Sequence, residues 1–321
     1  MNRISRIEDV VLDVAVSPEF ARDRICFAAA LSGLYRSDDG GQTWVSTVPA
    51  EEAVSVFTAG LSPEFGRDHR LFAGLEGGVL RSWDGGQNWA AAVLPLPPPQ
   101  VLSLVVSPAF AKDSTVFAGT AEDGVFRSND GGVSWTSSNF GLLDRNVLCL
   151  VLSPQFECDD TLFVGVESGV YRSTNGGRAW RGVDFPVEAG PVLDLAISPD
   201  FAVDSLLYAG TDAGGLLASA DRGDSWAQVQ AGMLSSATGR VSPGDGRHQA
   251  INAIALSPDF PRQPDILVAA QDGLYVSRDQ GLSWSVRAPT SGVLTLAAPY
   301  GFSDRSPLLV GLAEGGVQWV D

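Results

Sequence analysis

Short runs in which hydrophobic and polar residues alternate return along this chain roughly every 45 residues. Such period-two runs, rich in Val, Leu and Ile, predict β-strands. Each is followed by a second apolar run, such as Leu162–Gly165, and a third, such as Gly169–Arg172. We name the predicted strands A, B and C in chain order. The strand A runs, all of which end in Ser-Pro, are Val11–Pro18, Val54–Pro63, Val101–Pro108, Val147–Pro154, Val192–Pro199 and Ile251–Pro258.

A polar octet, S-x-D-x-G-x-x-W, ends each repeat. Its copies are Ser37–Trp44, Ser82–Trp89, Ser128–Trp135, Ser173–Trp180 (with Asn175 in the Asp place), Ser219–Trp226 and Ser277–Trp284. Self-similarity at such a period indicates a repeat architecture. Gly permits a sharp reversal, Asp and Ser accept backbone hydrogen bonds, and Trp buries a large surface at the start of a strand D. The octet residues expected to be structural are Asp39, Asp84, Asp130, Asn175, Asp221, Asp279, Trp44, Trp89, Trp135, Trp180, Trp226 and Trp284.

These octets resemble the Asp-box, or BNR repeat, of sialidases, sortilin-type receptors, some glucan-degrading enzymes and photosystem II assembly factors. The resemblance covers nearly the whole chain and implies a β-propeller. It implies little about activity, because catalytic and non-catalytic families share the box. Sialidase chemistry is a poor match: Arg6-Ile7-Glu8 lacks the Pro of the usual motif, and Tyr35, Tyr171 and Tyr275 occupy equivalent repeat positions.

We therefore predict an all-β fold, a single seven-bladed β-propeller with four antiparallel strands in each blade. The 321 residues divide into repeats at about 10–53, 54–99, 100–145, 146–190, 191–249, 250–291 and 292–321 plus 1–8, in one domain. The seventh repeat lacks a box. We predict that Asn2–Ile7 pairs with Gly316–Val320 as its missing strand and closes the ring, because an open ring leaves unpaired edges.

Charge and composition narrow the function. With 38 acidic and 21 basic residues, the formal charge is −17, which argues against binding nucleic acid or anionic lipid. Cys26, Cys149 and Cys158 lack metal-ligand spacing, and we expect neither a metal nor a cofactor. The N-terminus shows no secretory signal, so we expect a cytoplasmic monomer, although a mature secreted form has the same appearance.

In such blades the A–B loops and boxes share one end, and the B–C turns and D–A connections share the other, where repeats differ most. Most B–C turns carry acids, and only the first blade, with Leu31-Ser32, lacks one. The acids are Glu76, Glu122, Asp123, Glu167, Asp212, Asp272 and Glu314. A ring of carboxylates at the channel mouth attracts a cation or a basic segment, but acids beside Gly are also ordinary turn residues. The longest D–A connection, residues 231–250, adds Arg240, Arg247 and His248, either to bind an anion or to fold onto the ring.

The Arg that precedes the box Ser, at Arg36, Arg81, Arg127 and Arg172, is predicted to pair with the Asp of the A–B loop in each blade. Two classes of function are consistent with these features of the sequence. The first is a non-catalytic scaffold that binds a protein or peptide on the B–C and D–A face. The alternative is a carbohydrate-active propeller, a glycoside hydrolase or a glycan binder, that uses the mouth carboxylates.

Overall fold

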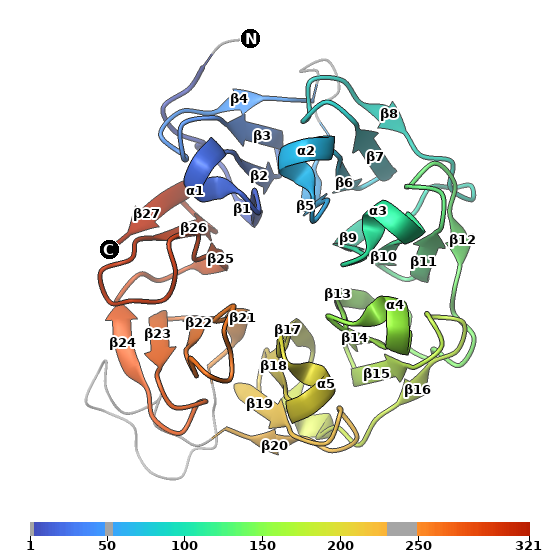
Figure 1. Cartoon of the computed structure of the whole chain (residues 1–321), viewed down its shortest axis with the longest axis vertical. Coiled ribbons are helices and arrows are strands. Elements are labelled where there is room, and N and C mark those ends of the chain that lie inside the picture. Colours follow the sequence, from blue (N-terminus) through green and yellow to red (C-terminus); the bar gives the residue numbers. More distant parts are fainter. Residues whose placement is uncertain (1–2, 49–53, 230–248) are drawn as a thin grey trace.

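The computed structural model describes residues 3–48, 54–229 and 249–321. In these residues, seven antiparallel sheets are arranged side by side around one axis, as Figure 1 shows. Strands follow chain order within every sheet, so the first lies nearest the axis and the last lies at the rim. The fold is a seven-bladed β-propeller, and the predicted fold class is confirmed.

Strands A and B form the inner half of each blade. The A strands are β1 (Val11–Val16), β5 (Val56–Leu61), β9 (Val101–Val106), β13 (Val147–Leu152), β17 (Val192–Ile197), β21 (Ile251–Leu256) and β25 (Val293–Ala297). The B strands are β2 (Cys26–Ala30), β6 (Leu71–Leu75), β10 (Val116–Thr120), β14 (Leu162–Val166), β18 (Leu207–Thr211), β22 (Ile266–Ala270) and β26 (Leu308–Leu312). Every residue of the B strands is buried, because both faces of this strand pack against neighbouring blades.

Strands C and D form the outer half. The C strands are β3 (Gly33–Ser37), β7 (Gly78–Ser82), β11 (Gly124–Ser128), β15 (Gly169–Ser173), β19 (Leu216–Ser219), β23 (Gly273–Ser277) and β27 (Val317–Val320). The short D strands are β4 (Val45–Ser46), β8 (Ala90–Ala91), β12 (Thr136–Ser137), β16 (Arg181–Gly182), β20 (Ala227–Gln228) and β24 (Ser285–Ala288). A single 3-10 turn, η1 (Val187–Ala189), lies in the connection that follows β16. In the described residues the seventh blade has three strands.

A one-turn helix joins strands A and B in the first five blades: α1 (Phe20–Asp23), α2 (Phe65–Asp68), α3 (Phe110–Asp113), α4 (Phe156–Asp159) and α5 (Phe201–Asp204). The Ser of each Ser-Pro pair donates to the Asp that ends the helix, at 2.5–2.7 Å. The other carboxylate oxygen accepts a backbone N–H two residues further on, at 2.8–3.0 Å. Both oxygens of the loop Asp are therefore used within its own loop.

In the second to sixth blades, the Phe of the A–B loop packs edge-on against an aromatic ring in strand B of the preceding blade. The ring centroids are 5.7–6.0 Å apart in the pairs Phe27–Phe65, Phe72–Phe110, Phe117–Phe156, Phe163–Phe201 and Tyr208–Phe260. This separation and orientation are favourable for aromatic pairs. The repeated Phe of the sequence is thus a contact between blades.

Each box is held by its own Ser and Asp. In the second blade, Ser82 donates to Asp84 at 2.8 Å and accepts the Gly86 N–H at 2.8 Å, and the second oxygen of Asp84 accepts the Asn88 side chain at 2.7 Å. The seventh box residue supplies that last donor in five boxes. In the remaining box it is Ala179, which has no donor, and there the Asp is replaced by Asn175.

The Gly at the fifth box place is required by packing. Gly132 has a φ of +80°, and a Cβ there would lie 2.4 Å from the Phe72 ring of the preceding blade. The box also contacts its own A–B loop, because the Gly40 N–H donates to the Arg24 carbonyl at 2.9 Å, and the other five boxes make the equivalent bond. We call this end of the ring the box face.

Neighbouring blades are joined at the carbonyl of the fourth box residue. Arg36 donates to the Gly85 carbonyl, and Arg127 and Arg172 donate to the equivalent Gly176 and Arg222 carbonyls at 2.8 and 2.7 Å. The prediction that these arginines pair with the loop Asp is wrong. The loop Asp already uses both oxygens in its own loop, whereas the box carbonyl of the next blade has no other donor within the box.

Other donors replace the Arg in the later blades. The fifth blade has Ala218 in that place, and the Tyr208 hydroxyl donates to the Gln280 carbonyl at 3.2 Å instead. The seventh blade uses Trp319, whose indole N–H donates to the Gly40 carbonyl of the first blade at 2.8 Å. The bond to the next box is thus kept while its donor changes.

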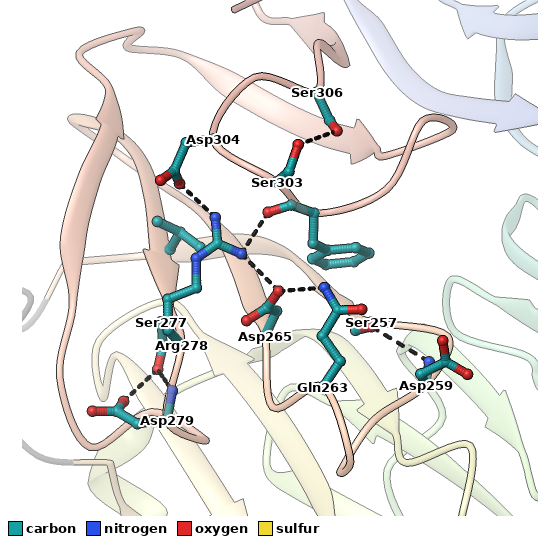
Figure 2. A network of polar contacts seen from close by, with 12 residues as sticks. Ser257, Asp259, Gln263, Asp265, Ser277, Arg278, Asp279, Ser303, Asp304 and Ser306 are labelled. Carbon is teal, nitrogen blue, oxygen red and sulfur yellow. Dashed lines mark hydrogen bonds and ion pairs between the residues drawn. The ribbon is translucent and has the colours of Figure 1, made fainter.

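The junction between the sixth and seventh blades has a different network, shown in Figure 2. The seventh blade has no box to accept a bond, and Val276 occupies the Arg place in the sixth. Arg278 instead donates to Asp265 at 2.7 Å and to the Phe302 carbonyl and Asp304 at 2.5 Å each. One arginine therefore joins the A–B loops of the last two blades.

The N-terminal segment links the first and last blades. Ile4 and Trp44 exchange two backbone hydrogen bonds, of 2.9 and 2.8 Å. Ile7 is fully buried and packs in one cluster with Leu309 and Trp319. The predicted pairing with Gly316–Val320 is wrong for residues 3–7: no ladder forms, and β27 is the edge of its sheet.

The bridge between Ile4 and Trp44 can be compared with a contact in the second blade. In the second blade, Val93 follows strand D and bonds to the box of the next blade, accepting the Trp135 N–H at 3.1 Å. Ile4 likewise accepts the Trp44 N–H, but it also donates its own N–H to the Trp44 carbonyl, so its bridge is antiparallel whereas that of Val93 is parallel. The described part of the segment therefore pairs with the first box at one residue and is not a strand D of the seventh blade. Among the described residues, no helix is long and apolar enough to cross a membrane.

Candidate functional site

The B–C turns lie directly beside the starts of the A strands. In six blades the first N–H of the turn donates to the carbonyl just before strand A, at 2.8–3.4 Å. The pairs are Leu31–Val10, Glu76–Ser55, Ala121–Gln100, Asp212–Pro191, Gln271–Ala250 and Ala313–Gly292. The turns and the last residues of the D–A connections therefore meet close to the axis of the ring. We call this end the B–C face.

Most of the predicted turn acids are exposed on this face. Glu76, Glu122, Asp123, Glu167, Asp212 and Glu314 are exposed. Glu167 also accepts a hydrogen bond from Asn146 at 2.7 Å. Asp272 is half-buried and accepts bonds from Tyr275 and Gln249, each at 2.8 Å. Burial and the Asp272 carboxylate raise the pKa of Tyr275. The predicted Arg240, Arg247 and His248 lie outside the described residues.

The first blade also has a carboxylate at its turn, and it comes from a different segment. Asp9 accepts the Ser32 N–H at 2.6 Å and the Val10 N–H at 2.7 Å. Asp144 does the same for the turn of the fourth blade, accepting the Ser168 N–H at 2.9 Å. We missed Asp9 in the sequence because we considered only acids within the B–C turns. An Asp shortly before strand A is the signal that identifies it.

Acidic residues far outnumber basic residues in the B–C turns and D–A connections. Within the described B–C turns and D–A connections, counting residues 3–10 as the connection into the first blade, there are 12 acids and three bases. The bases are Arg3, Arg6 and Arg145; the acids are Glu8, Asp9, Glu76, Glu122, Asp123, Asp144, Glu167, Asp184, Glu188, Asp212, Asp272 and Glu314. A surface with this excess attracts cationic groups and repels anionic ones.

An apolar collar lies inside the acids. The second residue of every A strand is a bulge, at which the pairing with strand B slips by one residue. These residues are half-buried, on the strands nearest the axis, at the B–C end. We name them the axial collar: Leu12, Phe57, Leu102, Leu148, Leu193, Asn252 and Leu294. Six of the seven are apolar.

Two carboxylates that sequence reasoning missed lie one residue deeper. Asp13 and Asp194, at the third place of their A strands, are half-buried. Asp13 accepts bonds from Thr58 and the Ala59 N–H, at 3.1 and 2.9 Å, and Asp194 accepts the Ile254 N–H at 2.7 Å. Burial raises the pKa of both, that of Asp194 to about 7, with repulsion from Asp13 contributing. An Asp inside an apolar strand was the available signal.

The carboxylates of this face are dispersed rather than clustered. Within the part of the chain that the structure describes, no three His, Cys, Asp or Glu side chains are close enough to share a metal ion. Asp13 and Asp194 each accept backbone N–H groups of a neighbouring A strand, so they have a role in joining blades. The chemistry of this face is an apolar centre surrounded by separate, mostly exposed carboxylates.

The comparisons with known proteins agree with this architecture. The model of the BNR/Asp-box repeat matches residues 35–46, the first box. A search of curated proteins by sequence finds no match. Among solved structures, the GH74 xyloglucanase from Xanthomonas campestris is 18% identical, with a TM-score of 0.74 over 99% of this chain and 55% of that one. This chain thus spans about half the length of that enzyme.

Two smaller propellers match over nearly their full length. The structure of YCF48 bound to D1 peptide is 16% identical, with a TM-score of 0.69 over 100% of this chain and 96% of that one. YCF48 from Cyanidioschyzon merolae is 14% identical, with a TM-score of 0.66 and coverage of 97% and 95%. At such identity the likeness shows the fold alone. The chain is therefore a seven-bladed β-propeller with BNR/Asp-box repeats.

Proposed function

We propose that this protein is a non-catalytic scaffold whose B–C face binds a segment of a partner protein that carries both basic and apolar side chains. The observation that carries the proposal is the axial collar inside an excess of carboxylates. Exposed turns on a rigid scaffold are also the usual place for binding residues. The boxes and A–B loops, by contrast, use their polar groups within the fold.

The two parts of the face select for different features of the partner. The collar offers apolar surface that a hydrophobic side chain can cover, at about 25 cal/mol per Å² of apolar area removed from water. The surrounding acids favour Lys or Arg beside that side chain and disfavour acidic segments. Charge complementarity of this kind mainly increases the association rate and the specificity. A short basic and apolar peptide meets both requirements.

The comparisons support this class of function without identifying the partner. YCF48, which has nearly the same length, is a propeller whose structure includes a bound peptide. The xyloglucanase shares the fold over only 55% of its own chain. Since both likenesses are of fold alone, the choice between peptide and carbohydrate depends on the face itself, and its apolar collar and dispersed acids favour the peptide.

The proposal is tested by selecting binders from a random peptide display library and measuring their affinity by fluorescence anisotropy. We expect enrichment of peptides with Lys or Arg next to an apolar residue. Binding should weaken between 50 and 200 mM salt, because salt screens exposed charges. A variant with Glu76→Gln, Glu167→Gln and Glu314→Gln should lose about tenfold in affinity.

The matched control is Glu64→Gln, Glu157→Gln and Asp200→Asn, three exposed or half-exposed acids of the A–B loops. It removes the same charge from the box face and should bind the peptides as the unmodified protein does. Equal loss in both variants contradicts the proposed face. If no peptide is enriched, and a glucan oligosaccharide binds or is cleaved in a way that depends on the turn acids, the carbohydrate alternative replaces the proposal.

A further inference from the structure

A second site lies at the rim of the ring, in a groove beside strand D (β12) of the third blade that also involves the box of the fourth. The groove has a volume of about 440 Å³ and is lined by Arg127, Arg178, Asn129, Asn139 and Phe140, together with the hydroxyl residues 136–138. Its lining contains no Asp or Glu, although the chain carries a net charge of −17. The groove is therefore lined by cationic side chains and by side chains that can form hydrogen bonds.

The neighbouring junction shows what this groove lacks. Between the fourth and fifth blades, Arg172 donates to the box carbonyl and also pairs with Asp224, the sixth residue of that box, at 2.7 Å. Between the third and fourth blades, Arg127 makes the same bond to its box carbonyl, but the sixth residue of that box is Arg178. A second cation thus occupies the place where the adjacent junction has a carboxylate.

Two other arginines of this row have a carboxylate partner that Arg127 lacks: Arg36 pairs with Asp38, and Arg172 pairs with Asp224. Arg127 lies over the Phe117 ring, as Arg81 lies over the Trp83 ring. The Nε of Arg127, like that of Arg81, is buried and has no hydrogen-bond partner.

The charges that face Arg127 leave it short of a counterion. Asp160 and Asp113 are the nearby acids, and Asp160 is loosely paired with Arg178 at 3.9 Å. Burial and the repulsion from Arg178 lower the pKa of Arg127. Arg127 and Arg178 both line the groove, and its lining contains no carboxylate. Two guanidinium groups in one groove form a favourable position for an oxyanion, which both can bind through charge-assisted hydrogen bonds.

We propose that this groove binds a small oxyanionic ligand, a phosphate monoester or a carboxylate, that carries an aromatic or other apolar group. Arg127 and Arg178 bind the oxyanion, and Asn129 and the nearby hydroxyls supply further hydrogen bonds. Phe140, 80% exposed at the rim of the groove, contacts the apolar group. This site is independent of the B–C face and of the partner proposed to bind there.

The test is isothermal titration calorimetry with phenyl phosphate, benzoate, inorganic phosphate and phenol. We expect phenyl phosphate or benzoate to bind more tightly than the two fragments, and the preferred one identifies the oxyanion. Arg178→Asp copies the pairing of the adjacent junction, so the variant should fold, melt at a higher temperature and lose at least tenfold in affinity, since a charge-assisted bond contributes about 1.5–3 kcal/mol. Arg262→Asp, which removes an exposed arginine with an equally loose partner at 3.7 Å, is the control and should bind normally.

The reciprocal change strengthens the test. Asp224→Arg places two arginines at the next junction, and this variant should melt at a lower temperature and be restabilised by phenyl phosphate. Phe140→Ala should weaken phenyl phosphate but not inorganic phosphate, whereas Leu282→Ala, at another exposed residue, should change neither. Unchanged affinity in Arg178→Asp, or equal binding of phenyl phosphate and inorganic phosphate, overturns the proposal.

Discussion

The two faces of this ring carry many carboxylates, but the chain uses them differently. On the box face, Asp84 and its equivalents accept hydrogen bonds from the box, and in the first five blades the Asp of the A–B loop uses both oxygens in its own loop. On the B–C face, acids such as Glu76, Glu122 and Glu314 are exposed on turns of two to four residues. The first set holds the fold together, and the second is exposed to solvent.

The box carboxylates also have lowered pKa values. Although partial burial acts to raise the pKa of Asp84, hydrogen bonds from Asn88, Ser82 and the backbone lower it to about 2, and Asp39 and Asp130 behave alike. A lowered pKa means that the charged form stabilises the fold above about pH 4, and that this contribution is lost as the pH falls toward 2. Sequence similarity between repeats thus marks the face that is used for folding.

The largest expected effect comes from the one segment that reaches both faces. Residues 3–9 pair with Trp44 at the box face and supply Asp9 at the B–C face. Deleting residues 1–8 exposes the cluster around Leu309 and Trp319 and removes the buried Ile7, so we expect a loss of about 3–5 kcal/mol or more. Urea denaturation measures it. Glu8→Ala, at an exposed residue, is the control, and equal stability of the deletion and the control contradicts the described closure.

A second prediction concerns Asp194, whose charge opposes folding. Its pKa is raised from 3.8 to about 7 in the folded protein, so its contribution to stability is full below pH 4 and is lost as the pH rises to 7. Asp194→Asn removes this loss, and its stability relative to the unmodified protein should increase by up to about 4 kcal/mol between pH 4 and 7.5. Denaturation at several pH values tests it. A stability profile for Asp194→Asn that runs parallel to that of the unmodified protein across this pH range contradicts the prediction.

The third comparison takes one acid from each face of the same blade. Asp113→Ala leaves the Ser107 hydroxyl and the Thr115 N–H without their acceptor, at a cost of about 2–3 kcal/mol. Glu122→Ala should change stability by less than about 0.5 kcal/mol, as surface substitutions usually do. The melting temperatures of the two variants test this prediction. Equal destabilisation contradicts the division of roles between the faces.

The smallest expected effect comes from Tyr208, which replaces the Arg of other blades as the hydrogen-bond donor to the next box. Tyr208→Phe removes the bond to the Gln280 carbonyl, at a cost of about 1 kcal/mol. Adding Ala218→Arg to that variant restores the donor that three other junctions use, and should recover most of the loss. Failure of the added arginine to recover stability shows that the equivalence of the two donors is wrong.

Much of the fold could be predicted from the sequence, because the same local pattern of strands, loop and box occurs in each repeat. Alternation predicts the strands, the spacing of the six box tryptophans together with the last repeat, which has no box, predicts seven blades, and the box contains its own hydrogen-bond donors and acceptors. Contacts between blades were harder. The sequence predicts that Arg127 pairs with the Asp of the A–B loop in its own blade, whereas in the structure it donates to the carbonyl of Gly176 in the next blade.

The closing contact and the candidate site show the same limit. Residues 3–7 fit a missing strand by length and pattern, yet among them only Ile4 forms a bridge, and its partner is the box residue Trp44 rather than β27. The exposed turn acids were found because they are local features. Asp9 and the axial collar were not, because they depend on which segments the ring brings together. Asp13 and Asp194 were visible as charges inside apolar strands, but their partners lie on other blades.

The most direct test of the division between the faces is one comparison of melting temperatures. One variant carries Glu76→Ala, Glu167→Ala and Glu314→Ala, and the other carries Asp39→Ala, Asp84→Ala and Asp130→Ala, so that each loses three negative charges. The account predicts that the first melts within about two degrees of the unmodified protein, and that the second melts at least ten degrees lower, because several hydrogen bonds are lost in each box. A similar decrease in both variants, or a larger decrease in the first, contradicts it.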